Sequence, residues 1–365
     1  MKIAMTGAGG FLGFHARALV RSLGGESVAV GLGEKYSPTA ACVGLDGSQR
    51  LIHMAGVNRG SDADVRDGNL QFARQLADSL RAVASPPAEV TYANSVQAGN
   101  QSVYGEAKSE AADIVRGAAE SVGANFTNVL LPNLFGEHGR PFYNSVVATF
   151  CEMLQTGKLP EVRDDKELVL LHAQNAAEVL LGTVKVDDME SLTTRRRVSD
   201  VLTQLQCIHE TYRSGDIPIL NSDFDRDLFN TYRSYRLQRP QDVAFSLDRR
   251  DDARGSFFEV CRSHGGPGQA SFSTTVPGIT RGQHFHRRKV ERFVVLSGHA
   301  QISMRRLFSD EVVCFEVNGS TPVAIDMPTL WTHKITNTAE SELFTMFWTN
   351  DVFDPANPDT FAEEV

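Results

Sequence analysis

The chain reaches a glycine-rich turn within its first ten residues. Lys2 to Met5 predicts a short buried strand, and Thr6-Gly7-Ala8-Gly9-Gly10-Phe11-Leu12-Gly13 leads from it into a helical pattern. Glycines between a strand and a helix let the backbone approach a pyrophosphate, whose negative charge the helix N-terminus favours. This order predicts a βαβ unit that binds a dinucleotide. The alternative is a glycine turn that only packs against its own helix.

The residues after the second expected strand, Ser27 to Leu32, bear on the choice of dinucleotide. Glu34 and Lys35 stand side by side there. A carboxylate at this position suits the 2′-hydroxyl of NAD, whereas a cation suits the 2′-phosphate of NADP. The residues leave NADPH and NADH both open. A further apolar strand over Leu51 to Gly56 ends in small residues where an adenosine can lie.

Tyr104 and Lys108 lie four residues apart in a helical stretch, so their side chains point to the same face. An ammonium beside a phenol lowers the pKa of the phenol, which can then pass a proton to a carbonyl oxygen near neutral pH. Ser95, at the end of an expected strand, can hydrogen-bond the same oxygen. A lone Tyr-x-x-x-Lys is usually helix surface. Behind a glycine turn, the three residues predict a catalytic set for hydride transfer.

These motifs and Pro132-Asn133-Leu134-Phe135-Gly136 resemble the extended short-chain dehydrogenase/reductases that act on nucleotide sugars. The resemblance implies that Asn133 faces the sugar nucleotide. It also implies that the cofactor is bound by Gly7, Gly10, Phe11, Leu12, Gly13, His53, Ala55, Gly56, Tyr104 and Lys108. Members of this family often carry an arginine just before the Pro-x-Asn segment, where this chain has Leu130 and Leu131.

The pattern changes near Leu237 to Gln241, after which short β-rich runs are broken by Gly and Pro. A chain of 365 residues is also long enough for about two domains. We therefore expect an α/β Rossmann-type, doubly wound parallel sheet with a substrate lobe over residues 1–238. An all-β domain is expected over residues 239–365.

The all-β segment carries a candidate metal site. His284 and His286 are two residues apart on an expected strand and so face one side. With Glu291 and His333 they offer three imidazoles and one carboxylate, a ligand set for a divalent transition metal. This spacing resembles the cupin signature, which implies a double-stranded β-helix, or jelly-roll. Leu330 stands where the second cupin motif carries glycine, which predicts an altered turn before His333.

A second likeness overlies the cupin motif. Arg254-Gly255-Ser256-Phe257-Phe258-Glu259 and Arg281-Gly282-Gln283-His284 resemble segments of the nucleotide-sugar 3,5-epimerases, which are also cupins. The resemblance implies that Arg254 and Arg281 bind the diphosphate and that His284 removes a proton next to a 4-keto group. The two roles of His284 compete, because a ring nitrogen that ligates a metal cannot act as a base.

The order of the two halves resembles the bifunctional capsular-polysaccharide synthesis enzymes nearly end to end, including Tyr143 to Cys151 and Pro358-Asp359-Thr360. This resemblance implies C3 epimerisation of a UDP-4-keto-6-deoxy-HexNAc in the cupin domain. NADPH-dependent reduction of the C4 ketone in the first domain would follow, giving UDP-2-acetamido-2,6-dideoxy-L-talose or a close analogue. It further implies a homodimer with zinc in the cupin.

Composition narrows the partners. A net charge of -9 argues against nucleic acid and anionic membranes, and the five scattered cysteines without Cys-x-x-Cys indicate a reducing compartment. The start of the chain enters the glycine turn instead of an apolar signal core, and no run approaches the about 20 apolar residues of a membrane span. We expect a soluble, cytoplasmic protein with a UDP-sugar as partner.

Two other functions stay open from the residues. The first is a monofunctional NAD(P)H-dependent 4-ketohexose reductase whose cupin serves dimerisation or sugar binding. The second is a nucleotide-sensing regulator of reductase ancestry, against which the intact Ser95, Tyr104 and Lys108 speak, since a sensor needs no proton-transfer group.

Overall fold

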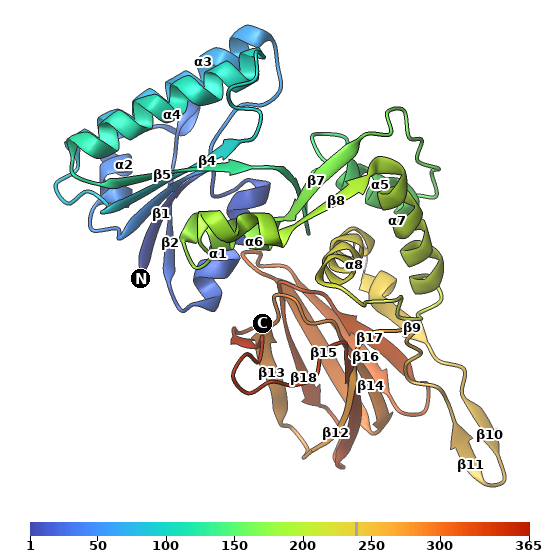
Figure 1. The fold of residues 1–365 in the computed structure, drawn as a ribbon. Coiled ribbons are helices and arrows are strands. Elements are labelled where there is room, and N and C mark those ends of the chain that lie inside the picture. The colour runs from blue at the N-terminus through green and yellow to red at the C-terminus, as the bar shows by residue number, and fades with distance from the viewer. Residues whose placement is uncertain (238–239) are drawn as a thin grey trace. The chain divides into compact units, whose positions relative to one another are not determined.

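The computed structural model describes residues 1–237 and 240–365 (Figure 1). Two compact units share the chain, and each is assembled from two separate stretches. The first unit consists of Met1–Phe135 and Glu167–Arg196, and the second of Gly136–Lys166 and Arg197–Val365. Each unit is described by itself below.

A five-stranded parallel sheet forms the centre of the first unit. Its order is β2-β1-β3-β4-β5, with β1 (Lys2–Thr6), β2 (Glu26–Val30), β3 (Arg50–His53), β4 (Glu89–Ser95) and β5 (Asn125–Leu131). The chain goes outward from β1 to β2 and then returns past β1 to β3. The connections therefore diverge at the carboxyl ends of β1 and β3, the place where such sheets bind ligands.

Helices cover both faces of this sheet, because alternate strand residues are apolar on either side. One buried cluster joins the sheet to α2 (Pro38–Leu45), α3 (Asp62–Ala82) and α4 (Val103–Ser121). A second cluster on the other face joins it to α1 (Phe11–Ser22) and α6 (Ala173–Leu181). Figure 1 shows α3 and α4 on one side and α1 and α6 on the other. The predicted doubly wound sheet is confirmed.

Short elements complete the first unit. They are the 3-10 helices η1 (Gly33–Lys35) and η2 (Val186–Leu192), and a small sheet in the order β6-β7-β8, with β6 (Asn133–Phe135), β7 (Glu167–His172) and β8 (Thr193–Arg197). β6 pairs with β7 in parallel, so the segment that carries Asn133 leaves the main sheet and is held by a second one.

The second unit contains a sandwich of two antiparallel five-stranded sheets. One sheet has the order β12-β19-β14-β17-β9, with β9 (Ala244–Ser246), β12 (Gln269–Thr275), β14 (Glu291–Ser297), β17 (Val323–Met327) and β19 (Leu343–Thr349). The other has the order β16-β15-β18-β13-β20, with β13 (Thr280–Phe285), β15 (His299–Arg306), β16 (Val312–Asn318), β18 (Trp331–Asn337) and β20 (Phe361–Ala362). The predicted all-β C-terminal fold is confirmed.

Three helices belong to the same unit as the sandwich: α5 (Val146–Gln155), α7 (Val198–Tyr212) and α8 (Asp223–Arg236). Buried polar contacts join α7 and α8 to the sandwich, and α5 packs against these two helices. The Tyr212 hydroxyl donates to Asp326 Oδ2 at 2.7 Å, and Arg292 Nε donates to Asp326 Oδ1 at 2.6 Å. Arg233 Nη2 donates to the Met327 carbonyl at 2.7 Å. These contacts fix α7 and α8 against β14 and β17.

The remaining elements are η3 (Pro240–Val243) and a separate hairpin of β10 (Arg250–Asp252) and β11 (Gly255–Phe257). The hairpin is exposed along both strands and projects from the sandwich in Figure 1. The expected domain boundary between residues 238 and 239 lies outside the described residues. On either side of it, α8 and the sandwich pack as parts of one unit.

Candidate functional site

The glycine turn lies at the carboxyl end of β1, next to the end of β3. Gly7 has a φ of +66°, and a Cβ there would be 2.8 Å from the Ala55 backbone nitrogen, so only glycine lets the turn pack against β3. A Cβ on Gly13 would collide with the Gly7 carbonyl. α1 begins at Phe11 without a side-chain cap at its N-terminus. Its first N–H groups can therefore bind an anion such as a pyrophosphate.

Thr6 connects the two strand ends, and sequence reasoning did not single it out. Its hydroxyl oxygen accepts N–H groups of Met54 and Ala55 at 3.1 and 3.2 Å, which leaves its hydrogen to donate to His53 Nδ1 at 2.6 Å. Burial, aided by Lys108, lowers the pKa of His53 to about 3, so the imidazole is neutral. The threonine that opens the Thr-Gly-x-x-Gly-x-x-Gly motif was the available signal.

The expected catalytic residues come together at the end of β4 and the start of α4. The Ser95 hydroxyl lies near the Tyr104 side chain and favours the ionised form of the phenol. Lys108 Nζ donates to the Ala93 carbonyl at 2.9 Å and lies 4.3 Å from the centre of the Tyr92 ring. Burial lowers the pKa of Lys108 to about 7.

The structure corrects one part of the sequence argument. Burial raises the pKa of Tyr104, and the nearby Ser95 hydroxyl only partly opposes this. Lys108 was expected to lower that pKa, but its ammonium is directed at the Ala93 carbonyl, and burial weakens its own positive charge. Tyr104 is therefore a protonated phenol, ready to donate a proton rather than to accept one.

Gly105 explains how the loop from Ser95 returns to Tyr104. Ser102 caps α4 by accepting the Gly105 N–H at 3.1 Å. A Cβ on Gly105 would collide with the backbone oxygen of Gln97 and with Asn100. The glycine between the predicted catalytic residues Tyr104 and Lys108 is thus required by the close approach of the loop that starts at Ser95.

Other predicted residues of the first unit lie nearer to solvent. Glu34 and Lys35 are both exposed on η1, after the end of β2, and neither is buried against the other. Asn133 is exposed on β6, and its Nδ2 donates to the Val169 carbonyl at 3.3 Å. Gly56 follows β3 and lies close to the Asn69 side chain.

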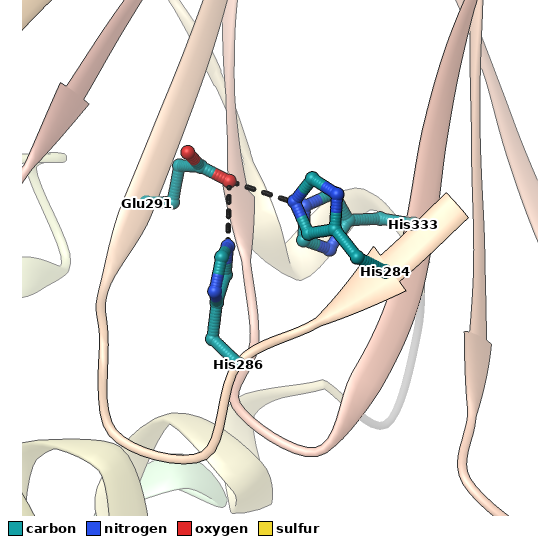
Figure 2. A group of neighbouring side chains, drawn as sticks. All are labelled: His284, His286, Glu291 and His333. Carbon is teal, nitrogen blue, oxygen red and sulfur yellow. Dashed lines mark hydrogen bonds and ion pairs between the residues drawn. The ribbon is translucent and has the colours of Figure 1, made fainter. Parts of the chain in front are cut away.

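The four predicted metal ligands converge in the second unit, as Figure 2 shows. His284 lies on β13 and is paired across the ladder with His333 on β18, whereas Glu291 opens β14 of the opposite sheet. His286 follows the end of β13. The potential ligand atoms all lie within 4.8 Å of one another. Glu291 Oε2 is 3.1 Å from Nε2 of both His286 and His333.

These distances fit a metal. Zinc with ligands at about 2.0–2.1 Å has neighbouring ligand atoms about 3.3 Å apart, so small movements would place an ion among the four groups. Burial and the two other histidines lower the pKa of His284 to about 3. Despite burial, His286 and His333 hold the pKa of Glu291 well below its usual range. His284 therefore offers a neutral imidazole and Glu291 a carboxylate, the states that bind a divalent cation, whereas, despite burial, Glu291 raises the pKa of His286.

Two backbone features position these ligands. A bulge between Gly282 and His284, with Gln283 at a φ of +63°, re-aims the end of β13. Leu330 also has a φ of +63° and is fully buried. Its N–H donates to the His286 carbonyl at 2.8 Å. The expectation of an altered turn is wrong in this respect: Leu330 adopts the left-handed conformation that glycine would supply.

Asp359, close to the end of the chain, supports the cluster and was not predicted as a site residue. Its carbonyl accepts from His286 Nδ1 at 2.6 Å, which leaves Nε2 of that ring for a metal. Its carboxylate accepts the N–H groups of Arg287, Arg288 and Lys289 at 2.8–3.2 Å. The Pro-Asp-Thr segment was the only signal in the sequence.

The two predicted diphosphate arginines lie in different surroundings. Arg281, on β13, donates to the Thr275 hydroxyl and the Thr274 carbonyl at 2.9 Å. Arg254 lies at the turn of the β10–β11 hairpin, pairs with Asp252 at 2.6 Å, and its side chain is 90% exposed. The Glu259 of the same motif lines a cavity of about 500 Å³ together with Phe257, Arg262 and Arg292.

Comparisons with known proteins cover both units. The NAD dependent epimerase/dehydratase family matches residues 79–181, and the Polysaccharide biosynthesis C-terminal domain matches residues 250–361. UDP-2-acetamido-2,6-beta-L-arabino-hexul-4-ose reductase from Pseudomonas aeruginosa is 30% identical, over 99% of this chain and 98% of its own length.

Solved structures agree. The capsular polysaccharide assembling protein CapF from Staphylococcus aureus is 29% identical, with full coverage of both chains and a TM-score of 0.61. UDP-glucose 4-epimerase from Thermotoga maritima is 15% identical over 65% of this chain and 99% of its own, with a TM-score of 0.52, and it shows the fold of the first part alone.

The fold and these matches define an enzyme that joins an NAD-dependent epimerase/dehydratase domain to a polysaccharide biosynthesis C-terminal domain. Within that class, the chain belongs to the CapF family, which includes the reductase from Pseudomonas aeruginosa. Membership implies use of an NAD(P) cofactor. Among the residues that the structure describes, no helix is long and apolar enough to cross a membrane.

Proposed function

We propose that the chain reduces the C4 ketone of a UDP-4-keto-6-deoxy-HexNAc with NADPH. The observation that carries this proposal is the placement of Ser95, at the end of β4 in the same parallel sheet that carries the glycine turn, near Tyr104, in the first turn of α4. A proton donor next to a dinucleotide site is what ketone reduction requires. The relative from Pseudomonas aeruginosa, which is named for reducing a 4-keto sugar of this class, supports the substrate.

The residues divide the work in a defined way. The bound cofactor supplies hydride to C4. Tyr104 donates its phenolic proton to O4 as negative charge develops there, and Ser95 orients the same oxygen. Lys108, with a pKa of about 7, stabilises the resulting phenolate by its charged form and can pass on a proton afterwards. Gly7, Gly10 and Gly13 bring the backbone to the pyrophosphate, and His53, Ala55 and Gly56 border the adenosine side.

We further propose that the β-sandwich, as a zinc-containing cupin, epimerises C3 of the keto sugar before reduction. A ketone at C4 acidifies the hydrogen at C3, so the epimerisation must come first. Arg281 and Arg254 are the candidate diphosphate ligands. His284 is proposed as a zinc ligand and not as the base, because a ring nitrogen that ligates a metal cannot accept a proton. The low pKa of His284 means that its imidazole is neutral, the state that binds a metal.

Zinc, the proposed ion, would be held by His284, His286, Glu291 and His333. Four protein ligands leave no open position, which favours a structural ion over a catalytic one. The expected product is UDP-2-acetamido-2,6-dideoxy-L-talose or a close analogue, and the expected assembly is a homodimer. The second candidate function is reduction alone, with the sandwich serving dimerisation or sugar binding.

One experiment separates the two. UDP-4-keto-6-deoxy-GlcNAc is incubated with the enzyme in deuterated water, with and without NADPH, and the products are followed by NMR. The bifunctional proposal expects deuterium at C3 without NADPH, and a reduced, C3-inverted sugar with it. NADPH oxidation without any C3 exchange would support the second candidate function, reduction alone. Exchange without NADPH oxidation would refute the proposed reductase.

Cofactor preference is tested at Lys35. If this exposed cation contacts the 2′-phosphate, Lys35→Glu raises KM for NADPH far more than KM for NADH. Glu34→Gln, which changes the neighbouring residue, is the matched control. Equal effects of Lys35→Glu on both cofactors would remove Lys35 from the site.

A further inference from the structure

A buried hydrogen bond connects the turn that carries a metal ligand to the segment just after β6. The Thr329 hydroxyl donates to Glu137 Oε1 at 2.8 Å, although the two residues are 192 positions apart. Glu137 is 1% exposed and Thr329 is 3% exposed. Both residues belong to the second unit. A buried carboxylate without a hydrogen-bond donor is costly, so the Glu137 carboxylate and the Thr329 hydroxyl hold their two segments together.

On one side, Thr329 belongs to the turn between β17 and β18. The next residue, Leu330, donates its N–H to the His286 carbonyl at 2.8 Å and accepts the Leu307 N–H at 3.1 Å. His333 follows on β18. The left-handed backbone at Leu330 keeps this turn in one arrangement. Movement of the turn would therefore displace two of the four candidate ligands together.

On the other side, Glu137 follows Gly136, which directly continues β6 and the Asn133 segment. α8 holds the backbone here, since His138 N–H donates to the Ser234 hydroxyl at 3.2 Å and Tyr235 donates to the Gly139 carbonyl at 2.6 Å. The Glu137 side chain is the part of this segment that reaches the metal-ligand turn. The arrangement joins the Asn133 segment to the metal cluster through one backbone link and one side chain.

We propose that Glu137 is a positioning residue that couples occupancy of the metal cluster to sugar-nucleotide binding by the reductase. A bound divalent cation fixes the turn at Thr329, the turn fixes Glu137, and Glu137 fixes the start of the Asn133 segment. Thermodynamic linkage makes the effect reciprocal, so the sugar nucleotide tightens metal binding by the same factor. The proposal rests on the proposed reductase function for its substrate side.

Hydrogen exchange tests the coupling without turnover. Full-length enzyme is stripped with a chelator, reloaded with Zn²⁺ alone, and exchange is measured in peptides that span residues 133–142. The wild type and Thr329→Ser, which keeps the hydroxyl, are expected to gain protection there on Zn²⁺ addition. Thr329→Val, which lacks the hydroxyl, is expected to bind Zn²⁺ but gain none. Thr336→Val removes an exposed hydroxyl that pairs with Thr280 and is the matched control.

Steady-state kinetics then test whether this coupling changes the binding of the keto sugar. In the wild type, Zn²⁺ removal is expected to raise KM for the keto sugar by about fivefold or more, with KM for NADPH unchanged. In Thr329→Val that KM is already high and insensitive to Zn²⁺. Wild-type protection or KM that does not respond to Zn²⁺, or a Thr329→Val protein that responds as the wild type does, overturns the coupling.

The failure of the proposed function has a different signature. Absence of NADPH oxidation in both the loaded and the stripped wild type would refute the reductase assignment, while the hydrogen-exchange comparison still decides whether Glu137 transmits the state of the cluster. If Thr329→Val does not fold, the comparison of wild type and Thr329→Ser with and without Zn²⁺ decides it.

Discussion

Lys108, which we propose to be catalytic, shows how a single side chain can oppose the stability of the fold that holds it. The ammonium is buried beside the Tyr92 ring and has one described hydrogen bond, to the Ala93 carbonyl. Burial therefore lowers its pKa from 10.5 to about 7. A buried charge without a carboxylate partner lowers the stability of the fold. We therefore interpret Lys108 as a functional residue and not as a stabilising one.

Replacing Lys108 with methionine should stabilise the protein in a pH-dependent way. In the unfolded chain the amine is protonated below pH 10.5, but in the folded protein only below about 7. The unfolded state thus binds more protons between these values, and the cost to folding grows as the pH falls from 10.5 to about 7, then stays constant. We expect Lys108→Met to melt at least about 3 °C above the wild type near pH 7, with the gap closing toward pH 10.5.

The matched control is Lys166→Met, which removes an exposed lysine that pairs with Asp164 at 3.8 Å. Thermal denaturation of the three proteins across this pH range measures the gap. A gap for Lys108→Met that stays the same at every pH would mean that the buried charge is not its cause.

Tyr104→Phe removes only the phenolic hydroxyl. Reduction should fall by at least about 100-fold, the size expected for a lost general acid, while NADPH binding persists. Because the proposed epimerisation uses other residues, deuterium exchange at C3 should continue at the wild-type rate. Steady-state kinetics, a fluorescence titration with NADPH and NMR of the sugar measure the three quantities. Loss of C3 exchange in this variant would contradict independent sites.

At the scale of elements, the metal cluster depends on two sheets of the sandwich at once. His284 and His333 come from β13 and β18 of one sheet, whereas Glu291 comes from β14 of the other. An ion among them would cross-link the sheets, and the free energy of binding would add to the free energy of folding. Such an ion would add a cross-link between the two sheets of the sandwich to the apolar packing that already joins them.

His286→Ala tests this role of the ion. We expect the variant to lose the metal on dialysis and to melt at a lower temperature than the wild type, with C3 exchange retained in the folded fraction. His264→Ala is the control, since His264 pairs with Asp216 in an exposed contact of the same unit. A folded, metal-free His286→Ala enzyme without C3 exchange would instead indicate a Lewis acid that holds the 4-keto oxygen.

The sequence predicts elements well where the signal is local. The glycine turn, the Tyr-x-x-x-Lys helix and the histidine strand each lie within about one turn or strand, so spacing alone brings their residues together. Contacts between distant segments are not visible in this way. Asp359 supports His286 from 73 positions away, and Glu137 reaches Thr329 from 192. No local pattern of charge or hydrophobicity specifies such pairs.

Local reasoning also misjudged backbone strain. Leu330 was expected to alter its turn because it stands where the second cupin motif carries glycine. A left-handed backbone costs a residue other than glycine about 1–2 kcal/mol. Burial of the whole leucine side chain offsets that cost, and the turn keeps the conformation of a glycine. Only the surrounding β-sandwich, formed by segments far apart in the chain, decides which of these two terms is larger.

At the scale of the whole molecule, the boundaries of the two packed units differ from the boundary that the sequence pattern predicts. The helices α7 and α8 precede the change in pattern near residue 240, but they share a buried network with the sandwich. Asp326 is fully buried and bonds both Arg292 and Tyr212. The helical and β parts of the second unit are therefore expected to unfold together.

Asp326→Asn should test this cooperativity. The change leaves the Arg292 guanidinium buried without a carboxylate, which typically costs about 3–5 kcal/mol. We expect a lower thermal midpoint and loss of hydrogen-exchange protection in α7 and α8 as well as in β14. Asp248→Asn, which breaks an exposed pair with Arg250 at 3.1 Å, should change stability by about 1 kcal/mol or less. Loss of protection in β14 alone would show that the helices are held independently.

Because each unit is assembled from two separate stretches of the chain, the order of synthesis limits when each unit can fold. A ribosome adds about 5–20 residues per second, so α5 emerges several seconds or more before the strands with which its unit packs. The cluster at His286 also depends on Asp359, which is synthesised 73 residues after His286. An ion proposed for this cluster would gain this support only after Asp359 has left the ribosome, so that metal loading would follow the synthesis of all the strands that carry its ligands.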